Sequence, residues 1–186
     1  MNEPILKDLV THCDDRGMLT ECCRIDWEEV NTPIKQVYVV TDRVPGIIRG
    51  FHCHDELIDY FNIVSGSAKF ILFNYDEYLS HVNIFMEKKK VFVGDADIYP
   101  NWTEDLKEEF MTFVSDDKCW YREYTIDTHS MKMLFIPPRW MHGWVSLEPN
   151  TTLLSNASDV FNPDKVDCIR VDWNILGKKI WEVQFK

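Results

Sequence analysis

Short stretches rich in β-branched and aromatic residues recur along the chain, and turn residues separate them. The stretch QVYVVT is typical, because apolar residues dominate it and the turn-forming DRVPG follows directly. Gly66-Ser67 between two such stretches favours a hairpin. The pattern predicts strands at 36–41, 47–52, 60–66, 68–74, 81–87, 89–94, 120–126, 132–137, 143–148 and 151–158. Many short strands with few helical patterns indicate an all-β sandwich, barrel or jelly roll.

One segment, 101–117, follows a helical pattern instead. Asn101 and Glu104 have the spacing of a capping box, and the apolar residues that follow recur at helical spacing: Leu106, Phe110 and Phe113. We expect a helix around 101–117, carried on an insertion over 88–128 that forms a surface element or a lid. The sequence is otherwise expected to form one domain, 1–186.

The composition of the chain indicates which classes of binding partner to expect. The 186 residues contain 31 Asp and Glu against 20 Lys and Arg, a formal net charge of -11. Such a surface repels phosphate backbones, so we expect no nucleic-acid partner. No apolar run approaches the roughly 20 residues of a membrane span, and we expect neither a membrane partner nor a signal peptide. The six cysteines show no CxxC spacing, which favours free thiols in the cytoplasm.

Two histidines stand close together in GIIRGFHCHDEL, residues 46–57. On a strand, His52 and His54 point to the same face, while Phe51 and Cys53 point to the other. An arbitrary HxH pair on a strand is usually solvent-facing. The same pair can also converge on a metal ion or on a substrate.

The surroundings of the pair resemble the first motif of the cupin superfamily, with Asp59 where glutamate is usual. The segment IPPRWMHGW resembles the second motif, with Pro137 five residues before His142 and Arg139 where glycine is expected. The resemblance implies a double-stranded β-helix jelly roll. It also implies an alternative metal site of His52, His54, Asp59 and His142, a ligand set that suits Fe, Mn, Ni or Zn.

A second resemblance is to the dTDP-4-dehydrorhamnose 3,5-epimerase family and the related sugar ketoisomerases. Five segments are similar to motifs of that family and come in its order: DDRGMLTE (14–21), RGFHCH (49–54), LFIPPRWMHGW (134–144), NASDVFNPDKVDCIRVD (156–172) and KKIWEVQ (178–184). Together they cover most of the chain outside 88–128. The resemblance implies an isomerase that works without a cofactor on a nucleoside-diphosphate keto sugar, and a homodimer in which an N-terminal strand joins the partner's sheet.

Epimerisation next to a ketone needs a base, a donor to the enolate oxygen and an acid on the opposite face. The family resemblance implies that His52 is the base and that Asp172 holds it. It also implies substrate contacts by Arg16, Glu21, Arg49, His54 and His142.

The sequence departs from the family at two functional positions. Asp59 stands where the family has a lysine, and Ser155 stands where it has the tyrosine acid; Tyr38 or Tyr60 is a possible replacement for that acid. We therefore expect a nucleotide-sugar epimerase acting at C3, C5 or both, in polysaccharide biosynthesis. The alternatives are a 3,4-ketoisomerase, a metal-dependent cupin dioxygenase or isomerase, and a non-catalytic sugar-binding cupin.

Overall fold

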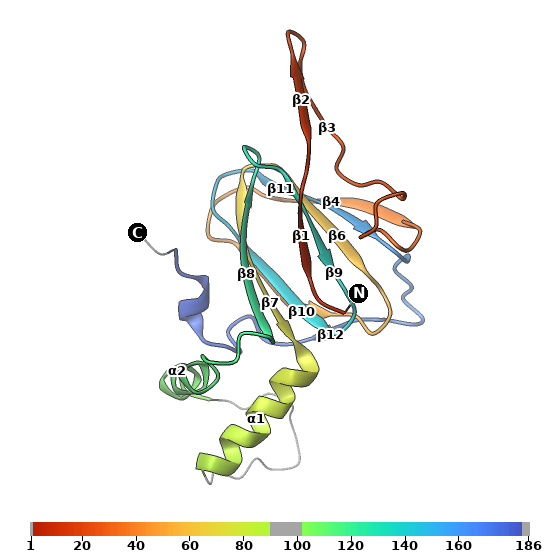
Figure 1. Cartoon of the computed structure of the whole chain (residues 1–186). Helices are drawn as coiled ribbons and strands as arrows, with labels where there is room; N and C mark the ends of the chain where they lie inside the picture. The colour runs from red at the N-terminus through yellow and green to blue at the C-terminus, as the bar shows by residue number, and fades with distance from the viewer. Residues whose placement is uncertain (1, 90–101, 184–186) are drawn as a thin grey trace.

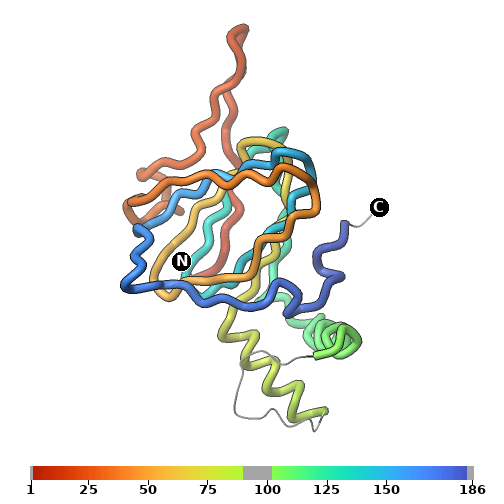
Figure 2. The backbone as a smooth tube through the Cα atoms, turned by 180° about the vertical axis from the view of Figure 1, so that it is seen from behind, coloured from red at the N-terminus to blue at the C-terminus, as the bar shows by residue number. Residues whose placement is uncertain are grey.

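The computed structural model describes residues 2–89 and 102–183 and contains two five-stranded antiparallel sheets that face each other (Figures 1 and 2). The first sheet has the order β1 (Ile5–Asp8), β9 (Lys132–Ile136), β6 (Asp59–Ser65), β11 (Thr151–Ala157) and β4 (Gln36–Asp42). The second has the order β12 (Ile169–Arg170), β5 (Ile48–Cys53), β10 (Trp140–Ser146), β7 (Ser67–Asn74) and β8 (Tyr121–Asp127). The expected all-β jelly roll is confirmed.

Apolar side chains form three clusters, one between the sheets and one outside each sheet. The central cluster includes Phe61, Phe70, Trp140 and Leu153. The cluster outside the first sheet surrounds Tyr60 and residues near the N-terminus, and the cluster outside the second sheet involves the helices. Because strands that are buried on both faces read as continuous apolar runs, β6 and β7 do not show the alternation of a half-exposed strand.

The hairpin predicted at Gly66-Ser67 is wrong. β6 pairs with β9 and β11, whereas β7 pairs with β8 and β10, so the chain changes sheet at this turn. Gly66 has a φ of 72°, a conformation that glycine adopts at no steric cost, and a Cβ there would lie 2.6 Å from Thr151 Oγ1. β6 and β7 are therefore consecutive in sequence but belong to different sheets, and Gly66 lies at the turn between the sheets.

The strand predicted at 81–87 is also wrong, because it lies within helix α1 (Tyr75–Lys89). The side chain of Asn74 accepts hydrogen bonds from the N–H groups of Asp76 and Glu77 and caps this helix. The buried residues of α1 follow helical spacing: Tyr75, Tyr78, Val82, Phe85 and Met86. Packing of this apolar stripe on the rest of the protein overrides the β propensity of the short stretch. The strand predicted at 89–94 lies outside the described residues, apart from its first residue.

The predicted helix is present as α2 (Glu104–Phe113), capped by Thr103, whose hydroxyl accepts from the N–H of Leu106 at 3.3 Å. The expected cap Asn101 lies outside the described residues. Of the insertion expected over 88–128, residues 121–127 form β8 in the second sheet, while the helical part begins earlier, at Tyr75.

The two helices lie at one end of the two sheets, and the C-terminal 3₁₀ helix η1 (Lys178–Trp181) lies near them (Figure 1). Their apolar side chains form one cluster with outward-facing residues of the second sheet, which buries Phe51 and Cys53 of β5. Each such side chain contributes about 1.5–3 kcal/mol when fully buried. The cluster fixes the strand that carries His52 on its other face. No helix in the described ranges 2–89 and 102–183 is long and apolar enough to cross a membrane.

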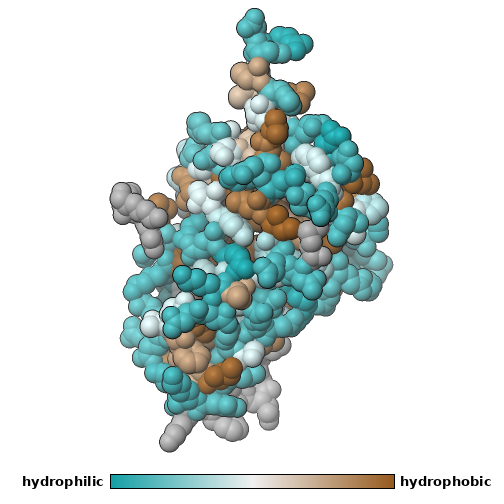
Figure 3. Space-filling view, viewed as in Figure 1, coloured by the Kyte–Doolittle hydropathy of each residue, from teal (hydrophilic) through white to brown (hydrophobic). Residues whose placement is uncertain are grey.

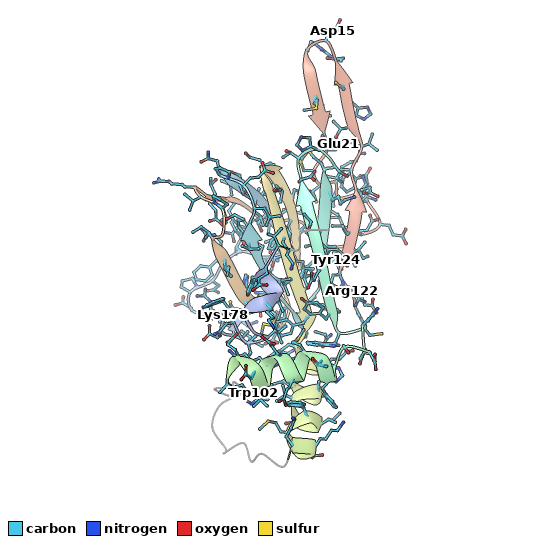
Figure 4. The ribbon with its side chains drawn as sticks, turned by 90° about the vertical axis from the view of Figure 1, so that its left-hand side faces the viewer. Asp15, Glu21, Trp102, Arg122, Tyr124 and Lys178 are labelled. Atoms are coloured by element: carbon cyan, nitrogen blue, oxygen red, sulfur yellow. The ribbon has the colours of Figure 1, made fainter. Side chains whose placement is uncertain are left out.

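One hairpin, β2 (Thr11–Asp14) with β3 (Gly17–Thr20), projects far beyond the two sheets (Figures 1 and 4). Asp15 lies at its tip and Glu21 at its base (Figure 4). We call residues 10–21 the arm. Its apolar side chains Val10, Met18 and Leu19 are 60–77% exposed, and Figure 3 shows apolar surface on it.

Candidate functional site

Four side chains, His52, His54, Asp59 and His142, converge between the two sheets. His52 and His54 share the inward face of β5, as the alternation of side chains along a strand predicts. The register of β10 on β5 sets His142 directly opposite His52. One ligand atom from each of the four residues lies within 4.8 Å of those of the others.

The close approach of β5 and β10 depends on two glycines. A Cβ on Gly143 would lie 2.9 Å from the Arg49 carbonyl oxygen and 2.9 Å from the Gly50 Cα, and a Cβ on Gly50 would lie 2.9 Å from the Gly143 Cα. These separations are too short for any residue with a side chain. The Gly50 and Gly143 pair therefore allows the two imidazole-bearing strands to meet.

His52 and His142 contact each other through their Nε2 atoms, which are 3.1 Å apart. Nδ1 of His142 lies 3.0 Å from the Trp140 carbonyl oxygen, which can only accept, so Nδ1 carries a proton. In the neutral pair, Nε2 of His142 is then the acceptor and Nε2–H of His52 is the donor. This arrangement leaves Nδ1 of His52 as the ring nitrogen with a free lone pair.

Burial makes both imidazoles weak bases toward protons from water. Burial, followed by the nearby His54 and Arg170, lowers the pKa of His52 to about 4. The pKa of His142 also lies well below its ordinary value, mainly because the ring is buried and secondly because His52 is adjacent. Both rings are therefore neutral near pH 7 and able to accept a proton.

Asp59 supplies the carboxyl group of the site. Its Oδ2 lies 3.5 Å from Nε2 of His54 and 3.6 Å from Nε2 of His142, and its Oδ1 is buried with no hydrogen-bond partner among the described residues. Burial raises the pKa of Asp59 to about 6, although the charge of His54 and the Ser155 hydroxyl act in the opposite direction. The carboxyl group consequently exchanges a proton near neutral pH.

A cavity of about 550 Å³ opens onto His52, His54 and Asp59 and is large enough for a small-molecule ligand. Its walls come from β4, β5, β6 and the segment 159–168, and both Lys165 and Arg170 line it. Tyr38 of β4 also lines it, facing the histidines from the opposite sheet.

The structure separates the two tyrosines that the sequence offered as an acid. Tyr60 lies outside the first sheet, fully buried, with its hydroxyl 3.0 Å from Thr32 Oγ1. Tyr38 stands opposite Ser155 in the pairing of β4 with β11 and faces the cavity. Partial burial raises the pKa of Tyr38, so its phenol stays protonated near neutral pH. Tyr38 is therefore the tyrosine that can donate a proton here.

Asp172 does not hold His52 in this structure. It is exposed, two residues beyond the end of β12, and within the described ranges no hydrogen bond or ion pair joins it to a histidine. The carboxyl group beside the imidazoles belongs to Asp59, which precedes Asp172 by more than a hundred positions. The short R-x-D match in the sequence did not identify the acidic partner of the site.

Three expected substrate contacts also lie away from the cavity of this chain. Arg16 is at the tip of the arm, paired with Asp14, and Glu21 pairs with Arg24 at 2.8 Å. Arg49 makes two bonds to Oδ1 of the buried Asp42, at 2.8 and 2.7 Å, and is not among the described residues that line the cavity. Of the expected contacts, His54 lines the cavity, while His142 belongs to the four-residue cluster but is not among the described residues that line the cavity.

A metal ion fits the donor set. Three imidazole nitrogens and a carboxylate are typical ligands of Fe, Mn, Ni or Zn, and the buried Oδ1 of Asp59 has no partner among the described residues. The same cluster is also chemically suited to proton transfer, because imidazole and carboxyl groups are the usual acids and bases of enzyme sites.

The chain is similar in sequence to one curated protein and in structure to several solved proteins. SpsL, a spore coat polysaccharide biosynthesis protein of Bacillus subtilis strain 168, is 25% identical over 184 residues, which cover 97% of this chain and 96% of that protein. The dTDP-4-dehydrorhamnose 3,5-epimerase of Bacillus anthracis superimposes with a TM-score of 0.62 at 17% identity, covering 92% of this chain and 80% of that one. The TDP-quinovose 3,4-ketoisomerase WlaRB of Campylobacter jejuni gives 0.58 at 20% identity, covering 95% and 98%.

These structures confirm the expected cupin fold. Residues 2–96, just over half of the chain, match the family described as FdtA: WxcM-like, C-terminal. That match includes β5 and β6, which carry His52, His54 and Asp59. The chain is a member of the FdtA family of WxcM-like C-terminal domains.

Proposed function

We propose that the protein is a nucleotide-sugar epimerase that acts on a nucleoside-diphosphate 4-keto-deoxy sugar, at C3, C5 or both, in polysaccharide biosynthesis. The observation that carries this proposal is the neutral imidazole of His52, in contact with that of His142, on one sheet and a protonated tyrosine on the other, with His52 and Tyr38 lining one cavity. A sugar ring between the sheets has a base on one face and an acid on the other, as inversion of a carbon centre requires. The name of SpsL and the two structurally similar sugar-nucleotide isomerases support the substrate class.

The reaction begins with proton abstraction. Nδ1 of His52 takes the proton from the carbon next to the ketone, and the electron pair of the C–H bond moves to the carbonyl oxygen to form an enolate. As His52 gains that proton, its Nε2–H can pass to Nε2 of His142, which lies 3.1 Å away. The positive charge is thereby shared by two rings. This sharing stabilises the protonated pair and offsets the low basicity that burial gives to each ring.

Tyr38 completes the inversion. Its phenolic O–H gives a proton to the opposite face of the same carbon as the carbonyl re-forms. The phenolate then regains a proton from water while the His52–His142 pair releases its extra proton to water, so both groups return to their starting states. Asp59 lies beside the enolate site where the related family has a lysine. In its protonated form, the carboxyl group donates a hydrogen bond to the developing charge instead of repelling it.

Binding of the diphosphate is assigned to the cations that line the cavity, Lys165 and Arg170. A guanidinium offers a planar pair of donors to phosphate oxygens, and an ammonium adds a point charge. Arg170 of β12 stands opposite His52 of β5 in the strand register. A diphosphate bound to Arg170 would therefore lie next to the base.

Isotope exchange tests this function. The protein is incubated in deuterated water with a nucleoside-diphosphate 4-keto-6-deoxy sugar and followed by proton NMR. We expect deuterium at C3 or C5 with inverted configuration at that carbon. Migration of the keto group to C3 would assign a 3,4-ketoisomerase instead, and binding without exchange would assign a sugar-binding cupin.

A metal-dependent cupin is the second candidate, favoured by the buried and unpartnered Oδ1 of Asp59 within three imidazoles. His52, His54, Asp59 and His142 would hold the ion, which would polarise a substrate oxygen as a Lewis acid. Elemental analysis of the purified protein separates the candidates. One transition-metal ion per chain, together with exchange lost on chelation, would replace the metal-free mechanism.

The biological unit we propose is a homodimer. The arm extends away from its own sheets with its apolar side chains exposed, and β4 is an edge strand that exposes Val37 and Val39. Edge strands with unpaired N–H and C=O groups invite pairing with another chain. A second copy that receives the arm would bring Arg16 and Glu21 toward a site, which neither reaches within its own chain.

Light scattering on a sizing column tests the dimer. We expect twice the chain mass of 22.1 kDa for the wild type, and a monomer when Met18 and Leu19 are both changed to Glu. A control pair, Lys118→Glu and Glu87→Lys, leaves the arm intact and should remain dimeric. A wild-type monomer would contradict this part of the proposal.

The six cysteines are all free, which supports a cytoplasmic location.

A further inference from the structure

Asp167 contacts the site twice, through its main chain and through its side chain. It lies in the cavity wall formed by 159–168, just before β12, and neither its position in the sequence nor the proposed mechanism gives it a role. Its carbonyl oxygen is hydrogen-bonded to Nδ1 of His54. Because a carbonyl oxygen only accepts, Nδ1 of His54 must carry the proton.

The carboxylate of Asp167 binds the backbone just after His54. It accepts from the N–H of Asp55 at 2.7 Å, of Glu56 at 3.1 Å and of Leu57 at 3.0 Å. Although burial acts to raise it, these three donors hold the pKa of Asp167 below its ordinary value, so the group remains ionised. One residue thus fixes both the ring of His54 and the turn that follows it.

The second ring nitrogen of His54, Nε2, is directed at Asp59. With Nδ1 protonated, the neutral ring presents the lone pair of Nε2 to Asp59 Oδ2, 3.5 Å away. Asp59 can donate to that lone pair only in its protonated form.

We propose that Asp167 is a positioning residue, which fixes His54 in the tautomer with Nδ1 protonated and Nε2 directed at Asp59 and the centre of the site. The inference rests on the proposed epimerase function for its effect on turnover. The tautomer itself depends only on the contacts of Asp167 and can be measured without substrate.

The test combines a spectroscopic and a kinetic measurement. Protein labelled with ¹⁵N-histidine is examined by long-range ¹H–¹⁵N correlation, and His54 is identified by the signal that is lost in His54→Gln. We expect His54 of the wild type to be protonated at Nδ1 alone. Asp167→Ala keeps the main-chain carbonyl but removes the carboxylate that binds the N–H groups of residues 55–57 and so holds this carbonyl against the His54 ring. In this variant we expect a mixture of tautomers and a kcat lower by about tenfold or more, with KM nearly unchanged, because misplacing a catalytic group costs rate before it costs binding.

Two further variants complete the design. Asp167→Asn keeps one acceptor oxygen and should give intermediate values, which also serves if Asp167→Ala does not fold. Asp164→Ala changes an exposed carboxylate of the same loop that is not among the described cavity-lining residues, and should match the wild type.

Either readout can overturn the inference. A wild-type His54 protonated at Nε2 would do so, as would an Asp167→Ala variant that keeps the pure tautomer or keeps the wild-type kcat. If the wild type shows no exchange with any keto sugar, the proposed function fails, while the tautomer comparison still decides whether Asp167 positions His54.

Discussion

Replacing His52 with glutamine is expected to lower the rate of deuterium exchange into the keto sugar by about 10²–10⁴, the usual contribution of a positioned general base. Glutamine keeps much of the side-chain volume and can donate to Nε2 of His142, which lies 3.1 Å from His52 Nε2. It offers no basic nitrogen. The loss should therefore fall on kcat, with little change in KM or in the melting temperature.

The matched control is His129→Gln, because His129 is exposed and is not one of the four converging residues. It should exchange deuterium at the wild-type rate. A His52→Gln variant within threefold of the wild type would place the base elsewhere, with His142 as the next residue to change. Thermal unfolding of each variant shows whether a loss of rate reflects a loss of fold.

Changing Asp59 to asparagine is expected to stabilise the protein above pH 6 and to do so less as the pH falls. Burial raises the pKa of Asp59 from 3.8 to about 6, so the folded state binds this proton more tightly than the unfolded state does. The stability contributed by the protonated group is fully present below about pH 4 and is lost as the pH rises through 6. A difference of about two pKa units corresponds to about 3 kcal/mol at pH 8.

Asparagine is neutral at every pH and does not bear this cost of a buried charge. Urea unfolding at pH 8 should therefore give Asp59→Asn a free energy of unfolding up to about 3 kcal/mol above that of the wild type. At pH 4 the difference should shrink toward zero. His52 and His142 titrate in both proteins, so comparison at a single pH cancels their contributions.

Asp164→Asn, at an exposed carboxylate, should leave the stability unchanged at both pH values. A variant Asp59→Asn less stable than the wild type at pH 8 would mean that the carboxylate is ionised and well compensated in the fold. We also expect this variant to exchange deuterium more slowly, because an amide N–H is a weaker hydrogen-bond donor to the enolate than a carboxyl O–H. Stability gained at the expense of activity would mark Asp59 as a functional residue.

Local pattern was sufficient for several features of the site. Side chains alternate along a strand for steric reasons, so HxH predicted that His52 and His54 share a face and that Phe51 and Cys53 point to the other. The spacing of the later motif likewise identified His142. The apolar spacing predicted α2, although the helix is capped by Thr103, and the motifs indicated the fold.

Local pattern failed where distant segments compete for the same residues. The segment 81–87 has the composition of a strand, yet its apolar side chains at helical spacing pack under the second sheet as part of α1. β6 and β7 read as a hairpin because turn residues separate them, but their partners lie in different sheets.

The sequence by itself determined that His52 and His54 point to one side and that an all-β fold carries them, because these properties depend on residue type and on the two-residue period of a strand. Only the tertiary structure decided which acid meets the imidazoles, Asp59 instead of Asp172, and which tyrosine faces them, Tyr38 instead of Tyr60. These choices depend on the register between strands and on the meeting of two sheets. Register is set by packing summed over both sheets, and no single stretch of the chain contains that information.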